Sequence, residues 1–184
     1  MTDYSVVSLN KLLYELPEED VSAILSSFSC ERDKDVESFL RDKAVVQEKK
    51  HISRTYLIVS NGEETELMAY FAVAVSSVEG DDLECSNSMR KKMNISGGLA
   101  MSYLIGQLGK RDGGAKGLGT FAIERAIGVI IEANARVGCR VIRIDCRESL
   151  IGYYESNGFT LVRSNKEGNL NLMVRIIETG SVPA

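Results

Sequence analysis

Apolar positions along this chain recur every second residue in some stretches and every third or fourth residue in others, as expected of a domain that combines strands with helices. In the amino-terminal half, the period of two predicts strands over residues 5–8, 55–59 and 67–75. Helical spacing predicts two short helices, one that starts near Pro17 and one that is capped by Asp33 or Asp35.

The third of these strands is nearly all apolar, so we expect a central strand that is covered on both faces. Asn61-Gly62 separates it from the preceding strand, which is a strong hairpin signal. Residues 76–100 show no sustained period. We predict an irregular connection with one helical turn over 88–92, and we expect it to control substrate access, since long loops often carry function.

The carboxyl-terminal half adds more strands and two helices. An apolar run over 103–108 leads through a Gly-rich basic loop into a long helix that begins at Gly117. Then follow a strand over 140–145, a short helix over 149–157 that ends at Gly158, and strands over 159–162 and 170–177. The pattern predicts a mixed α/β fold of about six or seven strands. We expect a single domain over 1–178 and a loose tail over 179–184.

Composition narrows the class of protein. The 184 residues carry a formal net charge of −4 and are 44% hydrophobic, which is typical of a globular domain. The acidic balance leaves no footprint of general nucleic-acid binding, although a local basic patch stays open. No apolar run reaches the ~20 residues of a membrane span, and the first residues do not resemble a signal peptide. We therefore expect a cytoplasmic protein with no membrane partner.

Metal and thiol chemistry find little support. The four cysteines show no C-x-x-C spacing, and His51 is the one histidine. A structural zinc site needs about four N or S ligands in close sequence pairs, so we expect no metal. Cys139 and Cys146 flank a predicted strand, and we interpret both as buried thiols. A catalytic cysteine paired with His51 remains an open alternative.

The stretch over 103–128 carries the clearest chemistry, because it reads as strand, Gly-rich basic loop and helix. The first turn of a helix presents unpartnered N–H groups and the positive end of the helix dipole. Glycines let that backbone approach a ligand closely, and Lys110, Arg111 and Lys116 add positive charge. The pattern predicts a site for a phosphate or pyrophosphate. The alternative is an ordinary strand-to-helix turn.

A second nucleotide-binding interpretation is weaker. Residues 117–122 satisfy G-x-G-x-x-A, the dinucleotide fingerprint. That fingerprint should directly follow an apolar strand, whereas Gly113-Gly114-Ala115-Lys116 intervenes here. Lys116 is followed by Gly117 rather than by Ser or Thr, so the loop is not a Walker sequence.

Two stretches together resemble the GNAT acetyltransferase superfamily, which binds acetyl-CoA. One is Lys116-Gly117-Leu118-Gly119 at the start of the long helix, and the other is Tyr153-Tyr154-Glu155 followed by Gly158-Phe159. About forty residues, with one helix and one strand, separate the two stretches, as in the family. Phe28-Ser29-Cys30 and Arg54-Thr55-Tyr56 resemble the toxin-type branch. The resemblance implies a mostly antiparallel mixed sheet with helices on both faces.

The resemblance also implies a set of cofactor-binding residues. Leu108 and Lys110, with Gly109 between them, would offer backbone groups to the pantetheine arm of acetyl-CoA. The pyrophosphate would be cradled by amides from Gly114, Lys116, Gly117, Leu118, Gly119 and Thr120, with Lys110, Arg111 and Lys116 as charge partners. Gly114 stands where the family has Gln or Arg, and Arg147, which we include in the set, stands where it often has Asn.

In the same comparison Tyr154 matches the tyrosine that protonates the departing CoA thiolate as a general acid. The alternative for Tyr154 is a packed aromatic residue. An amide near Leu108 would hold the developing oxyanion. The base that frees the attacking amine is left open between Asp145, Glu148 and water.

The resemblance implies acetyl transfer to a primary amine by direct attack. The acceptor stays open between an aminoacyl-tRNA, a protein and a small amine, and a homodimer is allowed. A tRNA acceptor would depend on the basic segment of Arg90, Lys91 and Lys92. The contrasting hypothesis is a catalytically inactive GNAT-like binding or regulatory module, which Gly114 favours.

Overall fold

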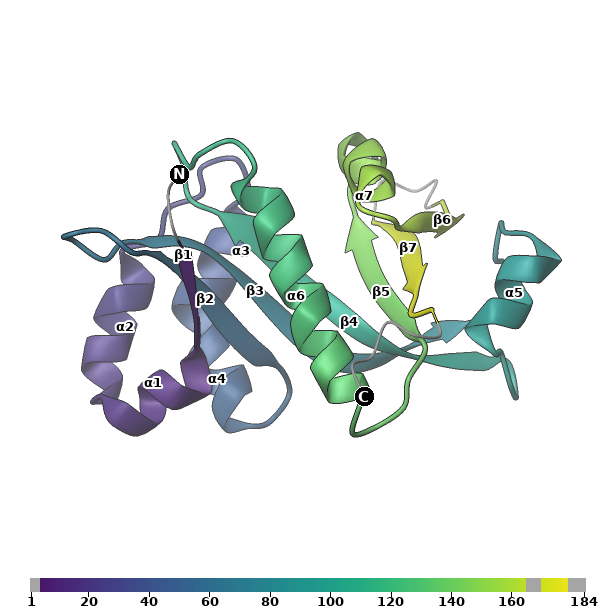
Figure 1. The fold of residues 1–184 in the computed structure, drawn as a ribbon, viewed down its shortest axis with the longest axis horizontal. Helices are drawn as coiled ribbons and strands as arrows, with labels where there is room; N and C mark the ends of the chain where they lie inside the picture. Colours follow the sequence, from purple (N-terminus) through teal and green to yellow (C-terminus); the bar gives the residue numbers. More distant parts are fainter. Residues whose placement is uncertain (1–3, 165–169, 179–184) are drawn as a thin grey trace. The chain divides into compact units, whose positions relative to one another are not determined.

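The structure is a computed structural model, and it describes residues 4–164 and 170–178 (Figure 1). The helical elements are α1 (Leu9–Glu15), α2 (Glu18–Ser26), α3 (Lys34–Ser38), the π-helix η1 (Phe39–Lys43), α4 (Ala44–Lys49), α5 (Asn87–Met93), α6 (Leu118–Asn134), the 3-10 helix η2 (Glu148–Leu150) and α7 (Ile151–Ser156). The strands are β1 (Tyr4–Ser8), β2 (Arg54–Ser60), β3 (Leu67–Glu79), β4 (Leu99–Lys110), β5 (Val141–Cys146), β6 (Thr160–Arg163) and β7 (Asn171–Ile176).

The described strands form a seven-stranded sheet in the order β1-β2-β3-β4-β5-β7-β6. Strand β4 runs parallel to β5, with Ser102–Ile105 opposite Val141–Ile144. The pairs β1–β2, β2–β3, β5–β7 and β6–β7 are antiparallel. The expected fold class, a mixed and mostly antiparallel sheet with helices, is therefore confirmed.

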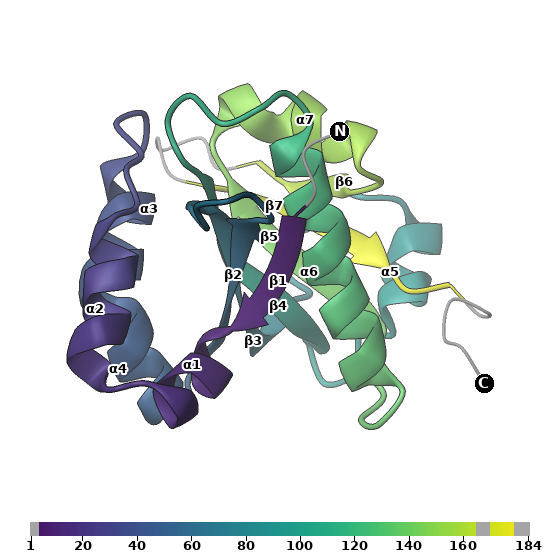
Figure 2. The same cartoon turned by 60° about the vertical axis from the view of Figure 1, so that its left-hand side comes forward.

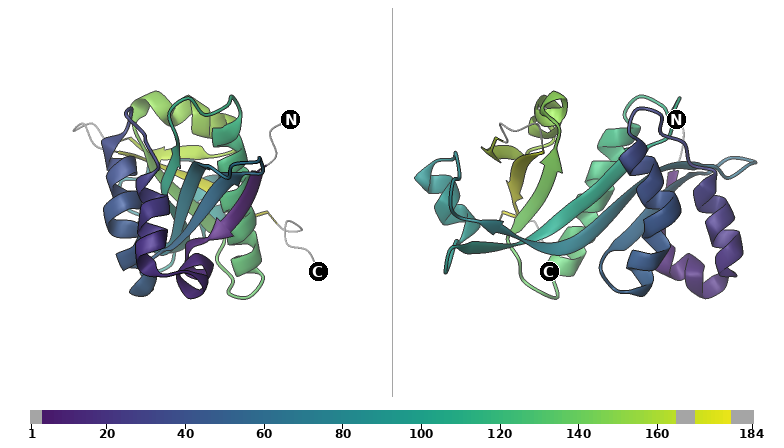
Figure 3. Two further views of the ribbon diagram at one scale, coloured as in Figure 1. Left: turned by 90° about the vertical axis from the view of Figure 1, so that its left-hand side faces the viewer. Right: turned by 180° about the vertical axis from the view of Figure 1, so that it is seen from behind.

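The chain divides into two compact units, the described parts of Met1–Ala74 with Gln107–Ala126 and of Val75–Gly106 with Ile127–Ala184. In the first unit, α2, α3 and α4 cover one face of β1–β3, and the first turns of α6 lie on the other face (Figure 2; Figure 3, left). The core of this unit is formed by side chains that include Leu9, Leu25, Phe28, Leu40, Leu57 and Tyr70, each fully buried.

The second unit has a core of its own. It gathers Val78, Met93, Ala100, Val141, Val162, Leu172 and Val174, from β3, α5, β4, β5, β6 and β7. Each unit thus buries apolar surface independently. The expectation of one domain over 1–178 stays a prediction, and the expected tail over 179–184 lies outside the described residues.

Several local expectations are confirmed in detail. The Asp33 side chain, rather than Asp35, caps α3 by accepting a hydrogen bond from the Val36 amide. Gly158 ends α7 with φ of 82°, in the left-handed region that favours glycine. The strands on either side of Asn61-Gly62 do form a hairpin, but six residues rather than two join them, and the Ser60 amide bonds the Glu66 carbonyl.

One helix was not predicted, and one local expectation is wrong. Helix α1 has no counterpart in the prediction, although Ser8 caps it by accepting a hydrogen bond from the Lys11 amide. The connection over 76–100 is not mostly irregular, because β3 continues to Glu79 and β4 already begins at Leu99. The Gly80 amide bonds the Gly98 carbonyl at 2.7 Å. Backbone pairing, rather than an apolar pattern, extends both strands.

Within the part of the chain that is described, no helix combines the length and the apolar character needed to cross a membrane. The same residues contain no group of three or more His, Cys, Asp and Glu side chains arranged to hold a metal ion.

Candidate functional site

The Gly-rich loop joins the end of β4 to the start of α6 within the first unit. Gly113 and Gly117 have φ of 70° and 89°, backbone conformations that side-chain-bearing residues rarely adopt. Both glycines are exposed, and nothing lies within 4 Å of the position where a Cβ would stand. The conformation of the loop therefore requires glycine, while the space above these residues is open.

This loop leaves a cluster of backbone donors without protein acceptors. Among the described residues, no backbone acceptor is present for the N–H groups of Ala115, Lys116, Gly117, Gly119 and Thr120. The first hydrogen bond that closes the helix runs from the Phe121 amide to the Gly117 carbonyl, at 3.0 Å. Several free N–H groups at the positive end of a 17-residue helix form an environment that favours an anion.

The amino-terminal side of the loop is held by reciprocal contacts with the connection between α2 and α3. The Asp112 amide donates to the Ser29 carbonyl at 3.0 Å, and the Asp112 carboxylate accepts from the Glu31 amide at 2.9 Å. The Cys30 amide, between these two residues, donates to the Glu37 carboxylate at 2.7 Å. This last hydrogen bond is the main cause of the lowered pKa of Glu37. Asp112 therefore ties the loop to a segment that is itself fixed.

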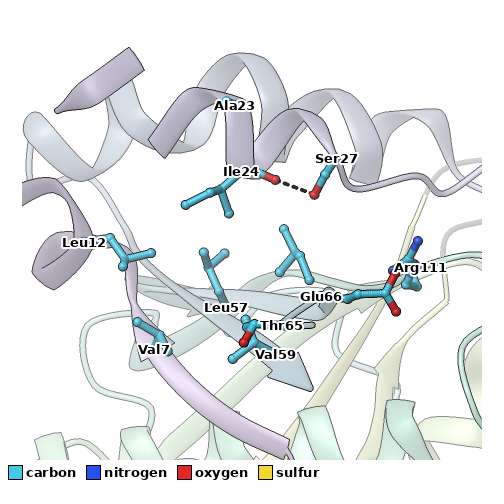
Figure 4. Close-up of a pocket in the computed structure, with 11 residues that line it drawn as sticks. Val7, Leu12, Ala23, Ile24, Ser27, Leu57, Val59, Thr65, Glu66 and Arg111 are labelled. Carbon is cyan, nitrogen blue, oxygen red and sulfur yellow. Dashed lines mark hydrogen bonds and ion pairs between the residues drawn. The ribbon is translucent and has the colours of Figure 1, made fainter. Parts of the chain in front are cut away.

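The three basic side chains of the loop have different surroundings. Lys110 Nζ lies 3.4 Å from the Gly114 carbonyl. Arg111 Nη1 lies 2.9 Å from Glu66 Oε1, and its guanidinium lies at the end of an apolar pocket beneath α2 (Figure 4). Lys116 is exposed and makes no ion pair with a described residue. Lys116 is therefore the cation of the three that is best placed to answer an added anion.

Packing leaves little room for a side chain at two glycines of the predicted set. A Cβ on Gly109 would lie 2.3 Å from Val36 Cγ1 and 3.0 Å from Tyr70 Cε1. A Cβ on Gly114 would lie 3.0 Å from both the Arg111 carbonyl oxygen and Leu118 Cδ2. Leu118 is itself buried at the first position of α6. A side chain at position 114 would therefore need a small shift of its neighbours.

Tyr154 belongs to the second unit and lies on α7, which follows the end of β5 (Figure 3, right). Its side chain is 6% exposed, and its ring packs edge-on against Phe159, with centroids 5.9 Å apart, and against Tyr153 at 5.2 Å. Its hydroxyl makes no hydrogen bond to a described residue. Burial, followed by the neighbouring Tyr153 and Cys146, raises the pKa of Tyr154, so the phenol stays protonated at neutral pH.

The other polar residues near α7 differ in availability. Asp145 is paired with Arg143, whose Nη2 lies 3.0 Å from Asp145 Oδ2. Glu148 and Arg147 are exposed at the start of η2. Burial, with a smaller effect from Asp145, raises the pKa of the Cys146 thiol to about 11, so Cys146 is a buried neutral thiol as expected.

Comparison with known proteins identifies the fold. No protein-family model and no curated protein matches the sequence. Among solved structures, a tyrosine-to-phenylalanine variant of KacT superposes with a TM-score of 0.73 at 19% identity, over 94% of each chain. AtaT in complex with acetyl-methionyl-tRNAfMet gives 0.71 at 23% identity, over 92% of this chain and 94% of that one.

A third similar structure is AtaTR bound with AcCoA, at a TM-score of 0.65 and 21% identity, over 94% of this chain and 93% of that one. The structure of an AtaT mutant toxin is also similar, with a TM-score of 0.66 at 22% identity over 83% of this chain and 82% of that one. The chain described here therefore has the fold of KacT and AtaT. At these identities the likeness establishes the architecture.

Sequence reasoning did not anticipate two contacts of the site. One is the pair of hydrogen bonds between Asp112 and the segment at Ser29–Glu31, and the other is the pairing of Arg111 with Glu66. Both join residues far apart in the chain, and a single sequence contains no signal of such contacts beyond the presence of the charged residues.

Proposed function

We propose that this protein is an N-acetyltransferase that takes its acetyl group from acetyl-CoA. The observation that carries the proposal is a set of backbone N–H groups with no backbone acceptor among the described residues, at the start of a long helix in a chain of this fold. They are those of Ala115, Lys116, Gly117, Gly119 and Thr120. Such a cluster matches the pyrophosphate of CoA in charge and in hydrogen-bonding capacity. One structure of the same fold is described as bound with AcCoA, which adds support.

In this proposal the loop binds and Tyr154 acts on the leaving group. The amides of Ala115, Lys116, Gly117, Gly119 and Thr120 would hold the pyrophosphate, with Lys116 as a charge partner and Lys110 beside Gly114. The predicted amides of Gly114 and Leu118 instead donate to the Arg111 and Ala115 carbonyls. The end of β4 at Leu108–Lys110 would face the pantetheine arm. Arg147 and Arg111 remain predicted members of the set, Arg111 after release from Glu66.

The proposed chemistry balances through Tyr154. The nitrogen of a neutral amine forms a bond to the acetyl carbon as the carbon–sulfur bond breaks. The Tyr154 hydroxyl gives its proton to the departing sulfur, and the phenolate then recovers a proton from the newly acylated nitrogen. The raised pKa of Tyr154 keeps the donor protonated at neutral pH and makes reprotonation of the phenolate favourable, while it weakens the phenol as an acid. The products are an amide and a free thiol.

We further propose an aminoacyl-tRNA as the acceptor. The support is that AtaT, which shares the fold, was solved with acetyl-methionyl-tRNAfMet. Helix α5 offers cations for such a ligand, since Lys91 and Lys92 are exposed, with Lys92 Nζ 3.4 Å from Glu178 Oε1. Arg90 instead donates to the Gly80 carbonyl at 2.7 Å, so we expect Lys91 and Lys92 to matter more for binding than Arg90 does. Transfer to tRNA should fall steeply with salt.

Calorimetric titration of acetyl-CoA into the purified protein tests the binding part of the proposal. We expect acetyl-CoA to bind at a single site, and to bind more tightly than pantetheine, which carries no pyrophosphate. A protein that binds acetyl-CoA but acetylates no aminoacyl-tRNA, protein or small amine would be a GNAT-like binding module. A protein that binds no CoA ester would contradict both functions.

A further inference from the structure

A cavity of about 550 Å³ lies in the first unit, beneath α2 and above β1 and β2 (Figure 4). Its walls are aliphatic over most of their area, with Leu12, Ile24, Leu57 and Val59 among the residues that line it. Leu57 is fully buried at its floor. A cavity of this size, mainly apolar and with few polar groups, has the character of a small-molecule site.

The polar end of the cavity is formed by the Arg111–Glu66 pair, with Thr65 nearby. The two charged residues are held unequally. The Arg111 amide donates to the Met68 carbonyl at 2.8 Å, and the Arg111 side chain is 26% exposed. The Glu66 side chain is 56% exposed. Half-exposed ion pairs contribute little stability, so Glu66 is the member that can turn toward water at small cost.

We propose that this cavity binds a small amphipathic carboxylate, with its hydrocarbon chain against the aliphatic wall and its carboxylate replacing that of Glu66 on Arg111. A guanidinium binds a carboxylate through two parallel hydrogen bonds, which fixes both the position and the sign of the ligand charge. Arg111 is the anchored partner, so the site selects an anion rather than an amine. The inference goes beyond the proposed function. The two share Arg111, which is also a predicted charge partner of the pyrophosphate, but none of the loop amides lines the cavity.

The test uses the full chain and octanoate, with acetate and octanamide as matched probes, followed by calorimetry. Octanoate should bind, and acetate and octanamide should each bind roughly tenfold more weakly or worse, since one lacks the chain and the other the charge. Equal binding of octanoate and octanamide would overturn the proposal, as would no binding of octanoate.

Two variants should change octanoate affinity in opposite directions. Arg111→Gln should weaken octanoate binding by about tenfold, as for loss of a charge-assisted hydrogen bond, whereas Glu66→Gln should tighten it severalfold by removing the competing carboxylate. Unchanged or weaker binding by Glu66→Gln would contradict the assignment. Unfolding curves check that both variants fold, and Ile24→Phe provides an independent variant that fills the cavity and should abolish binding.

A third control separates the cavity from the Gly-rich loop. Gly117→Asp places a negative charge in the loop, so it should leave octanoate binding unchanged. Loss of octanoate binding in Gly117→Asp would place the carboxylate at the loop and overturn the proposal.

Discussion

The Gly-rich loop and helix α7 are two candidate functional regions built on opposite principles. The loop offers main-chain donors: Gly113 and Gly117 adopt left-handed conformations with open space around them, and five amides have no backbone acceptor among the described residues. Helix α7 offers one buried side chain, the Tyr154 phenol, which is held between two aromatic rings. A main-chain site is destroyed by adding a side chain, whereas a side-chain site is destroyed by removing one atom.

Because the two regions differ in this way, substitutions in them should change different measured quantities. If the proposed function is right, changes in the loop should act on acetyl-CoA affinity, and changes at Tyr154 should act on the chemical step. A variant that changes both acetyl-CoA affinity and the chemical step would count against this division of roles.

The largest expected effect is that of Tyr154→Phe, which keeps the ring and its packing and removes the hydroxyl. A positioned general acid typically contributes 10²–10⁴-fold, so kcat should fall by roughly that factor while acetyl-CoA affinity stays within about threefold. Because the pKa of Tyr154 is raised, the wild-type rate should show no loss from phenol ionisation between neutral pH and pH ~10. Steady-state kinetics and calorimetry measure the two quantities.

Tyr153→Phe is the matched control, since adjacent helical residues point about 100° apart. An equal loss of kcat in both variants would mean that the acid lies elsewhere. Loss of the folded state in Tyr154→Phe would return Tyr154 to the role of a packed aromatic residue.

The next effect is that of Gly117→Asp or Gly119→Asp on the binding of acetyl-CoA. A carboxylate within ~4 Å of a pyrophosphate costs several kcal/mol, so we expect affinity to fall by about 100-fold or more in calorimetric titration. Gly138→Asp is the control, because Gly138 is also exposed with open space around it but lies outside the loop. If Gly117→Asp and Gly119→Asp bind as well as Gly138→Asp, the loop is not the site.

Asp112 is an anion in a region that we assign to anion binding. Substitutions at Asp112 therefore show whether it positions the loop or repels the ligand. If its role is to position the loop, Asp112→Ala should weaken acetyl-CoA binding by about tenfold through loss of the hydrogen bond from the Glu31 amide. Asp112→Asn keeps an acceptor oxygen and removes the charge, so it should bind as tightly as the wild type or more tightly. Tighter binding by both variants would show that Asp112 only repels the ligand.

The smallest expected effect is that of Lys116→Ala. An exposed cation that pairs with no described residue should contribute roughly a threefold to tenfold gain in affinity, and the gain should shrink as salt rises. Titrations at two salt concentrations measure it. An effect that is independent of salt would indicate that Lys116 acts through the shape of the loop rather than through its charge.

Much of this fold follows from local sequence signals, and the failures have local causes too. The periodicity of the helix after Gly117, the αL stop at Gly158 and the cap at Asp33 are encoded within a few residues, and the structure confirms them. Helix α1 was missed because seven residues directly after a strand give too short a periodic signal. The extension of β3 depends on pairing with a segment about twenty residues away, as at Gly80 and Gly98.

The candidate site shows the same limit. The glycines of the loop are visible in the sequence, and the structure shows that Gly113 and Gly117 are required by backbone conformation, whereas Gly109, at the end of β4, is required by close packing. The hydrogen bond between Asp112 and Glu31 joins residues 81 positions apart, and no sequence motif predicts it. Contacts of this kind depend on tertiary packing, which one sequence does not reveal.

The most direct test of the proposed function is a transfer assay with labelled acetyl-CoA, a pool of aminoacyl-tRNAs and the purified protein, with the product identified by its acetyl mass shift. We expect labelled N-acetyl-aminoacyl-tRNA with the wild type, and at least about a hundredfold less with Tyr154→Phe at equal occupancy by acetyl-CoA. Label on no amine, in a protein that calorimetry shows to be saturated with acetyl-CoA, would contradict the proposed acetyl transfer.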